Sequence, residues 1–414
     1  MKTLATWSII LNVVLATSPG RLAGDEARPF LIAPDGSRFF PIGLYSIPQF
    51  GNGDAIRDEA RAAGFNFLVG GDGKSEGFSR SSDIPGGPPA PDAKSRRGSL
   101  LDLTHQAERK KALLLELIEK EEKAPGVIVW QGPDEPNDFP FGIRPGPSPE
   151  GLAAGAALLR EKSKHPLWIN FGPTGDHRHP EDFDRLRPYL AVPDVVSVDI
   201  YPVGGGSDHQ QSPFAERGPA CVGVFTRNLV RMVSREGVQR KPVWMVLQGF
   251  GWGDLARTSN PPESWTGRTP TYDEVRFMSF DAVINGAGGV IYWGARYLPR
   301  SDPNSTWGSL KAVAAELHEL LPVLTADGQP ADHLVRLSNG SVEVAVRRPN
   351  GSTVLILANT STEPQTTSLG FHGIKPGALR PLGKTTAPAL RAPFSPLRLR
   401  PLEVAVFAVE VEPK

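Results

Sequence analysis

Short apolar runs alternate with amphipathic stretches along the chain from about residue 39. A continuous apolar run is typical of a β-strand that is covered on both faces, and an amphipathic stretch is typical of a helix that covers a sheet. Strands that alternate with helices predict a parallel α/β fold. The strands recognisable in this way lie at residues 39–45, 65–70, 127–131, 167–171, 195–201, 243–248 and 290–293.

Helices are expected between these strands, at residues 111–123, 150–164, 222–235, 272–285 and 310–324. A barrel of eight strand–helix units needs one strand more, and it must lie between residues 71 and 109. We place this third strand at residues 99–104, in a region rich in Pro, Gly and Ser. The prediction is therefore a TIM (β/α)8 barrel over residues 28–325, a span that suits the usual barrel length of about 250 residues.

The pattern changes after Leu324. Segments 334–337, 342–347, 353–358 and 402–411 are short and rich in β-branched residues. Turn signals such as Asn339-Gly340 and Asn350-Gly351 separate them. These features predict a second domain, an antiparallel β-sandwich over residues 330–414.

The N-terminus has the form of a secretory signal peptide. Lys2 precedes an apolar run at residues 4–16, and the small residues Ala23 and Gly24 follow. Such a run is too short to cross a bilayer. We expect residues 1–24 to be a signal peptide, the protein to be exported to the periplasm or beyond the cell, and the mature chain to have no membrane span. The only cysteine, Cys221, cannot form an internal disulfide, so this expectation rests on the signal alone.

Composition narrows the function classes. Lys and Arg total 45, as do Asp and Glu, so no charge excess indicates nucleic acid as a partner. The 44 glycines and 41 prolines indicate long surface loops, which often carry sites. The Gly-x-Ser-x-Gly and His-Glu-x-x-His motifs of esterases and zinc proteases do not occur. His177 and His179 have a metal-ligand spacing, but we interpret them as a polar loop and expect neither a metal nor a cofactor.

Acidic, amide and aromatic residues end several predicted strands. The fourth strand runs into Asp134 and Glu135, and the sixth places Asp199 and Tyr201 on one face by its period of two. The seventh ends in Gln248 and the eighth in Tyr292-Trp293. Reactive groups of TIM barrels lie where the strands end, so these residues predict a site at the carboxyl ends of the strands.

The chain over residues 39–324 resembles the clan-A glycoside hydrolases. The matching motifs are a Phe-Phe-Pro-Ile-Gly first strand, Trp-x-x-x-Asp-Glu-Pro after the fourth, Asp-x-Tyr-Pro on the sixth, and Gly-Gly-Val-Ile-Tyr-Trp on the eighth. The resemblance implies that Glu135 is the general acid/base. Two positions depart from the family pattern: Asp134 stands where Asn is usual, and Gln248 stands where a nucleophilic glutamate is expected. An amide cannot serve as a carboxylate nucleophile.

The adjacent Asp134 and Glu135 also resemble the pair found in substrate-assisted N-acetylhexosaminidases. That resemblance implies that Glu135 protonates the leaving oxygen while Asp134 orients the substrate's acetamido group, which attacks the anomeric carbon. Tyr201 would hold the acetamido oxygen. The other predicted substrate-binding residues are Asp199, Gln248 bonded to sugar hydroxyls, Trp293 stacked on a sugar ring, Tyr45, Asn170 and Trp252.

Two alternatives stay open at this stage. Asp199 could act as the general base of an inverting reaction, which needs carboxyl groups roughly 6.5–9.5 Å apart. The chain could also be a catalytically inactive carbohydrate-binding protein, an alternative that Gln248 favours and the pair Asp134-Glu135 opposes. The prediction is a secreted glycoside hydrolase acting on a polysaccharide or glycoconjugate.

Overall fold

The computed structural model describes residues 28–48, 53–70, 77–85, 99–137, 147–173, 186–204, 218–235, 238–256, 268–298, 306–329 and 331–411. The predicted signal peptide and the loop with His177 and His179 lie outside these residues. Within the described ranges, no helix is both long and apolar enough to span a membrane.

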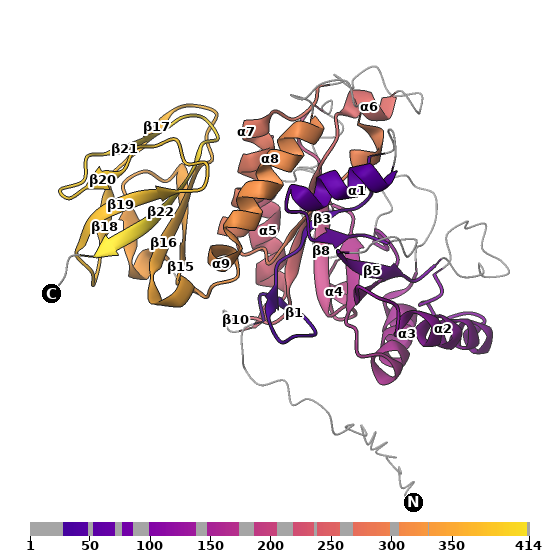
Figure 1. The fold of residues 1–414 in the computed structure, drawn as a ribbon. Coiled ribbons are helices and arrows are strands. Elements are labelled where there is room, and N and C mark those ends of the chain that lie inside the picture. Colours follow the sequence, from indigo (N-terminus) through magenta and orange to yellow (C-terminus); the bar gives the residue numbers. More distant parts are fainter. Residues whose placement is uncertain are drawn as a thin grey trace, which may run out of the picture.

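Eight parallel strands form a closed barrel in the order β11-β12-β3-β4-β5-β6-β7-β8, which confirms the predicted TIM barrel (Figure 1). Strand positions predicted at 127–131, 167–171, 243–248 and 290–293 are reproduced without shift. These runs are buried on both faces, so they are mostly apolar and stand out in the sequence. The barrel strands are β3 (Ile42–Leu44), β4 (Phe67–Leu68), β5 (Ser79–Asp83), β6 (Val127–Gln131), β7 (Leu167–Phe171), β8 (Val195–Ile200), β11 (Val243–Gln248) and β12 (Val290–Trp293).

The third barrel strand is β5, and the prediction at residues 99–104 is wrong. Residues 99–104 form turns instead. Strand β5 reads Ser-Arg-Ser-Ser-Asp, and its three central residues are buried with polar partners inside the protein. The Ser81 hydroxyl accepts from the Gly70 N–H at 2.8 Å, and the Arg80 guanidinium pairs with Glu121 at 3.2 Å. A strand made of polar residues with buried partners has no apolar pattern, so hydrophobic periodicity does not reveal it.

Helices surround the barrel, and local signals account for two of their starts. Ser148 caps α3 with its side chain and Pro149 follows at the first helical position, while Thr271 and Glu274 form a capping box on α7. The helix expected at 310–324 is divided at Leu320, two residues before Pro322. The helices are α1 (Gly53–Ala62), α2 (Ala107–Glu121), α3 (Pro149–Lys162), α4 (Arg187–Leu190), α5 (Cys221–Met232), α6 (Trp252–Ala256), α7 (Tyr272–Ile284), α8 (Thr306–Glu319) and α9 (Leu321–Leu324).

Two short antiparallel pairs lie outside the barrel wall. The first joins β1 (Leu31–Ile32) to β2 (Arg38–Phe39), just before the first barrel strand. The second joins β9 (Ser234–Arg235) to β10 (Val238–Gln239), between α5 and β11.

The C-terminal domain is antiparallel, as predicted. Its main sheet has the order β13-β15-β16-β22-β19-β20, and two smaller sheets pair β14 with β18 and β17 with β21. The strands are β13 (Gly328–Gln329), β14 (Val335–Leu337), β15 (Val342–Arg347), β16 (Thr353–Asn359), β17 (Gln365–Thr367), β18 (Leu369–Phe371), β19 (Pro376–Leu382), β20 (Leu390–Arg391), β21 (Leu397–Leu399) and β22 (Val404–Val411).

The central strands of this sheet, β16 and β22, are buried on both faces over most of their length. Leu355 and Phe407 point into the domain's own core, whereas their neighbours Ile356 and Val406 join the core of the barrel. Helix α7 packs against β15, β16 and β22, so it lies between the two domains (Figure 1). A strand that alternates between two apolar cores reads as a continuous apolar run.

Candidate active site

The carboxyl ends of the barrel strands bring the predicted site residues together. Asp134 and Glu135 follow β6, Asn170 lies in β7, and Asp199 lies in β8. Tyr45 comes directly after β3, and Trp293 ends β12. Because the strands are parallel and the barrel is closed, these ends meet at one mouth.

Glu135 occupies a backbone conformation that is unusual for a residue with a side chain. Its φ is 47°, in the left-handed region. The turn is held from both sides: the Glu135 N–H donates to the Asn170 carbonyl at 2.9 Å, and the Asn137 amide exchanges two 3.1 Å hydrogen bonds with Gly172. Strain of this kind is concentrated at functional sites. Asn137 was not among the predicted residues, although it follows the Asp-Glu-Pro motif directly.

Asp134 is exposed at the mouth and accepts hydrogen bonds from residues at the ends of two other barrel strands, β3 and β7. Its Oδ1 accepts from the Tyr45 hydroxyl at 2.9 Å and from the Asn170 amide at 3.1 Å. The Gln131 amide in turn donates to the Tyr45 oxygen at 2.6 Å. Burial and the charge of Asp134 raise the pKa of Tyr45 well above its usual value, so Tyr45 stays a phenol that donates to Asp134.

Asp199 and Glu135 form a carboxyl pair. Burial, the charges of Glu135 and Asp134, and a hydrogen bond to Glu135 raise the pKa of Asp199 well above its usual value, while a hydrogen bond to Tyr201 opposes the rise. Two carboxyl groups in such contact hold one proton between them.

Asn170 joins the two halves of this carboxyl cluster. Its amide nitrogen lies 3.1 Å from Asp134 Oδ1 and 3.4 Å from Asp199 Oδ1, and its oxygen accepts from the Ser197 hydroxyl at 2.8 Å. Trp168 donates to the same hydroxyl at 2.8 Å, which orients it. The buried amide therefore keeps both carboxyl groups in place.

Aromatic rings form one wall of the mouth. Tyr201 stacks on Trp293 with ring centroids 5.4 Å apart and an angle of 24°, and Trp252 approaches Tyr201 edge-on. Phe250 packs against both Tyr201 and Trp293. Trp293 is half-buried, so part of its ring is open to a ligand. Sequence reasoning missed Phe250, which follows the end of β11 by two residues and stands next to no polar signal.

Gln248 does not face the mouth as a sugar ligand. Its side chain is fully buried, and its Oε1 accepts from the Val203 N–H at 2.8 Å. Its Nε2 donates to the carbonyls of Val203 at 2.8 Å and Phe250 at 3.1 Å. Because the hydrogen bonds of its amide all go to the backbone, Gln248 is not the substrate contact that the sequence predicted. Its side chain instead holds the segment after β8 in place.

Asp83 is a residue of the mouth that sequence reasoning missed. It ends β5 and reaches solvent, yet the surrounding barrel atoms and the charge of Asp134 raise its pKa, while Arg80 opposes the rise. It was missed because its strand was placed elsewhere. Among the residues that the structure describes, no group of three or more His, Cys, Asp or Glu side chains is arranged to hold a metal ion.

Comparisons with known proteins agree with this architecture. Residues 341–407 match the family described as D-apionate lactonase, C-terminal immunoglobulin-like domain. No curated protein sequence matches the chain.

Solved structures of low sequence identity share the fold. A glycoside hydrolase of family 5 from Bacteroides vulgatus is 15% identical with a TM-score of 0.56, and the alignment covers 94% of each chain. The α-amylase from Geobacillus thermoleovorans, solved with acarbose, is 12% identical with a TM-score of 0.52, over 87% of this chain and 92% of the amylase. The chain therefore shares its overall fold with these solved structures, and its second domain has an immunoglobulin-like match.

Proposed function

We propose that the chain is a glycoside hydrolase that cleaves a polysaccharide or glycoconjugate, with Glu135 as its general acid/base. The observation that carries this proposal is the Glu135–Asp199 carboxyl pair, held in the mouth of a barrel whose fold occurs in glycoside hydrolases. A pair that holds one proton keeps a carboxyl protonated above the usual pKa of an aspartate. Glu135 is half-buried and Asp199 is buried, so Glu135 is the member that faces the substrate.

The nucleophile of the reaction belongs to the substrate itself. Gln248 offers no carboxylate and faces the backbone, so the nucleophile comes from an N-acetyl group on the sugar. Its carbonyl oxygen bonds to the anomeric carbon as the glycosidic bond breaks and Glu135 transfers its proton to the departing oxygen. Asp134, which Tyr45 and Asn170 orient, accepts the acetamido N–H. Glu135 then takes a proton from the water that opens the cyclic intermediate.

The test is hydrolysis of aryl glycosides with good and poor leaving groups, including N-acetylglucosaminides and glucosides. Glu135→Gln should lower kcat about 100-fold to 10,000-fold on the poor leaving groups and less on the good ones, because a good leaving group needs no proton. Asp134→Asn should slow hydrolysis of the N-acetylglucosaminides, and the glucosides, which lack the acetamido nucleophile, should not be cleaved by the wild type or the variant. Full activity of Glu135→Gln on poor leaving groups would overturn the assignment. A wild-type protein that binds glycans but cleaves none would favour the inactive binding protein.

A second candidate is hydrolysis of a sugar lactone. The match of residues 341–407 to the C-terminal domain of D-apionate lactonase favours it. Aldonolactones belong in the same substrate panel. Turnover of lactones without turnover of any glycoside would replace the first proposal by this one.

Export through residues 1–24 is proposed from the sequence pattern alone. N-terminal sequencing of the protein recovered outside the cytoplasm tests it. A mature N-terminus near residue 25 is the expected result, and an intact Met1 would contradict it.

A further inference from the structure

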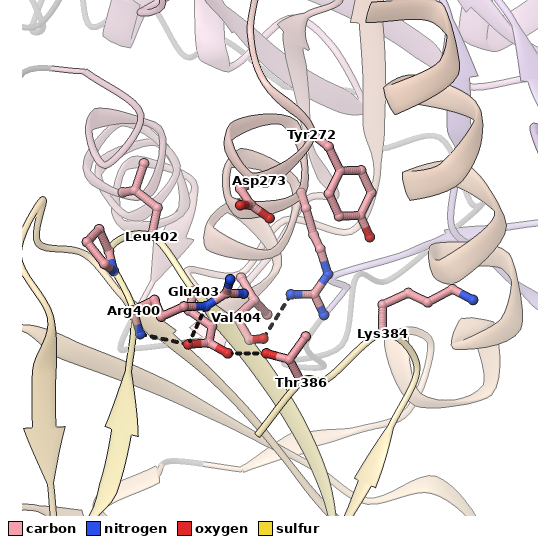
Figure 2. Close-up of a pocket in the computed structure, with 10 residues that line it drawn as sticks. Tyr272, Asp273, Lys384, Thr386, Arg400, Leu402, Glu403 and Val404 are labelled. Carbon is pink, nitrogen blue, oxygen red and sulfur yellow. Dashed lines mark hydrogen bonds and ion pairs between the residues drawn. The ribbon is translucent and has the colours of Figure 1, made fainter. Parts of the chain in front are cut away.

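A pocket lies at the junction of the two domains, away from the barrel mouth. It encloses about 250 Å³. Tyr272, Asp273 and Arg276 of α7 form one side, and Lys384 and Thr386 of the β-domain lie opposite (Figure 2). This volume is below the ~300–1,000 Å³ that is usual for drug-sized ligands, so the pocket suits one small ring.

The walls of the junction pocket are built from buried ionic contacts. Arg276 makes two 2.7 Å hydrogen bonds to the fully buried Glu316 and donates to the Val404 carbonyl at 2.8 Å. On the other side, Glu403 accepts from the Thr386 hydroxyl and the Arg400 N–H (Figure 2). These contacts tie the walls to both domains, so the pocket is preformed.

At the rim of the pocket, three polar side chains have no polar partner among the described residues. Within the described part of the chain, Asp273 and Lys384 have no ion-pair partner, and the Tyr272 hydroxyl has no hydrogen-bond partner. Asp273 and Lys384 are exposed, and the ring of Tyr272 is half-buried. A ligand in the pocket would therefore meet an acceptor, a donor and one accessible part of an aromatic ring.

The charges around the pocket balance. Arg276 is neutralised by Glu316 and Arg400 faces Glu403, which leaves one cation, Lys384, and one anion, Asp273. A ligand with a net charge of either sign would be attracted by one of these two groups and repelled by the other. A neutral ligand that carries both donors and acceptors fits, and a pyranose with several hydroxyls is such a ligand.

We propose that the junction pocket is a secondary glycan-binding site that holds one neutral sugar unit. The inference rests on the proposed function, since the glycan is taken to be one that the barrel cleaves. Tyr272 begins α7, and helices of a TIM barrel begin at the end where the strands finish. The α7 side of the pocket therefore begins at the end of the barrel that carries the mouth.

The test is affinity electrophoresis of the full chain in gels that contain a neutral glycan. The background is Glu135→Gln, so that the glycan is not cleaved during the run. The gels contain glycol chitin, a neutral glycan with the N-acetyl groups that the proposed mechanism needs. Soluble starch, arabinoxylan and mixed-linkage β-glucan serve as neutral glycans without them, and polygalacturonate is the acidic comparison. We expect a neutral glycan to retard the protein. Lys384→Ala and Asp273→Asn together should weaken the apparent affinity about tenfold, the effect of losing roughly 1.4 kcal/mol of hydrogen bonding.

Control variants separate the pocket from the mouth and from general surface effects. Lys375→Ala removes another exposed lysine of the β-domain and should not change the retardation. Trp293→Ala should weaken binding at the mouth while leaving a component that the junction substitutions abolish. Thermal unfolding of each variant checks that it is folded. Lys384→Ala is informative even if Asp273→Asn destabilises α7, because it keeps the Lys384 N–H bond to Glu316.

Unchanged retardation of the junction variants would overturn the inference, and so would failure of every neutral glycan to retard the parent. Retardation by polygalacturonate alone would also overturn it. Hydrolysis by the wild type without junction-dependent retardation leaves the proposed function standing. Junction-dependent retardation with no hydrolysis of any glycan would overturn the proposed function and leave the pocket as a glycan-binding site.

Discussion

At the scale of single residues, Gln248 shows most clearly how neighbours decide a role. Its place at the end of β11 is where a nucleophile would be expected, but the backbone of Val203 and Phe250 occupies both atoms of its amide. Two of its three hydrogen bonds need a donor. A carboxylate at this position could not supply them, so an amide is the side chain that this environment selects.

The substitution Gln248→Glu should therefore destabilise the protein without creating a double-displacement enzyme. An ionised carboxylate would face two carbonyl oxygens, and the expected cost is about 2–4 kcal/mol. Urea denaturation measures it, with Gln248→Met as the control that removes hydrogen bonds without adding charge. A stable Gln248→Glu protein with higher glycosidase activity would contradict the bracing role.

The buried Asp199 predicts how stability depends on pH. Its pKa is raised in the folded state, so the folded state favours the protonated form, and stability is lost as pH rises from the unfolded pKa of about 3.9 towards the folded pKa. Asp199→Asn cannot lose a proton and can still donate to Glu135. We expect it to melt at a higher temperature than the wild type at neutral pH, with the difference shrinking in acid, while activity falls. Parallel melting curves across pH would contradict this.

At the scale of elements, the turn after β6 matters because it places Glu135. Its left-handed φ is maintained by bonds to β7 and to Gly172, which follows β7. The strands could be predicted here because both are apolar runs. The strain could not, because it depends on a partner residue some 35 positions away in the sequence.

Asn137→Ala should impair catalysis more than stability. The buried Gly172 N–H and carbonyl would lose their partner, at an expected cost of about 1–3 kcal/mol, and the turn could relax. We expect kcat on poor leaving groups to fall at least about tenfold, with KM little changed, since a small misplacement of an acid slows proton transfer strongly. Unfolding and steady-state kinetics measure both effects. Wild-type kcat would show that the turn does not depend on Asn137.

At the scale of the whole molecule, α7 joins the barrel to the β-domain. Arg276 of α7 pairs with Glu316 of α8, and both side chains are almost fully buried. Arg276 also donates to the Val404 carbonyl of β22. Alternate residues of β16 and β22 enter two separate cores. The two domains therefore share an interior, and we expect them to unfold together.

Arg276→Met should destabilise both domains at once. It leaves Glu316 buried without its partner, at an expected cost of about 3–5 kcal/mol in the free energy of unfolding. The matched control is Arg380→Met, whose pair with Glu410 is exposed and worth about 0–1 kcal/mol. Urea denaturation followed by tryptophan fluorescence, which reports on the barrel, and by circular dichroism should show one transition. Two separate transitions in the wild type would contradict a shared interior.

The sequence by itself determined the barrel, the second β-domain and the location of the acidic site at Asp134 and Glu135. Apolar periodicity records burial, and the parallel topology then brings the strand ends together. Only the tertiary structure decided that Ser79–Asp83 is the third strand, that Asp199 contacts Glu135, and that Gln248 serves the backbone. Each of these depends on which polar groups meet across the fold, and hydrogen-bond partners distant in sequence leave no periodic trace in the chain.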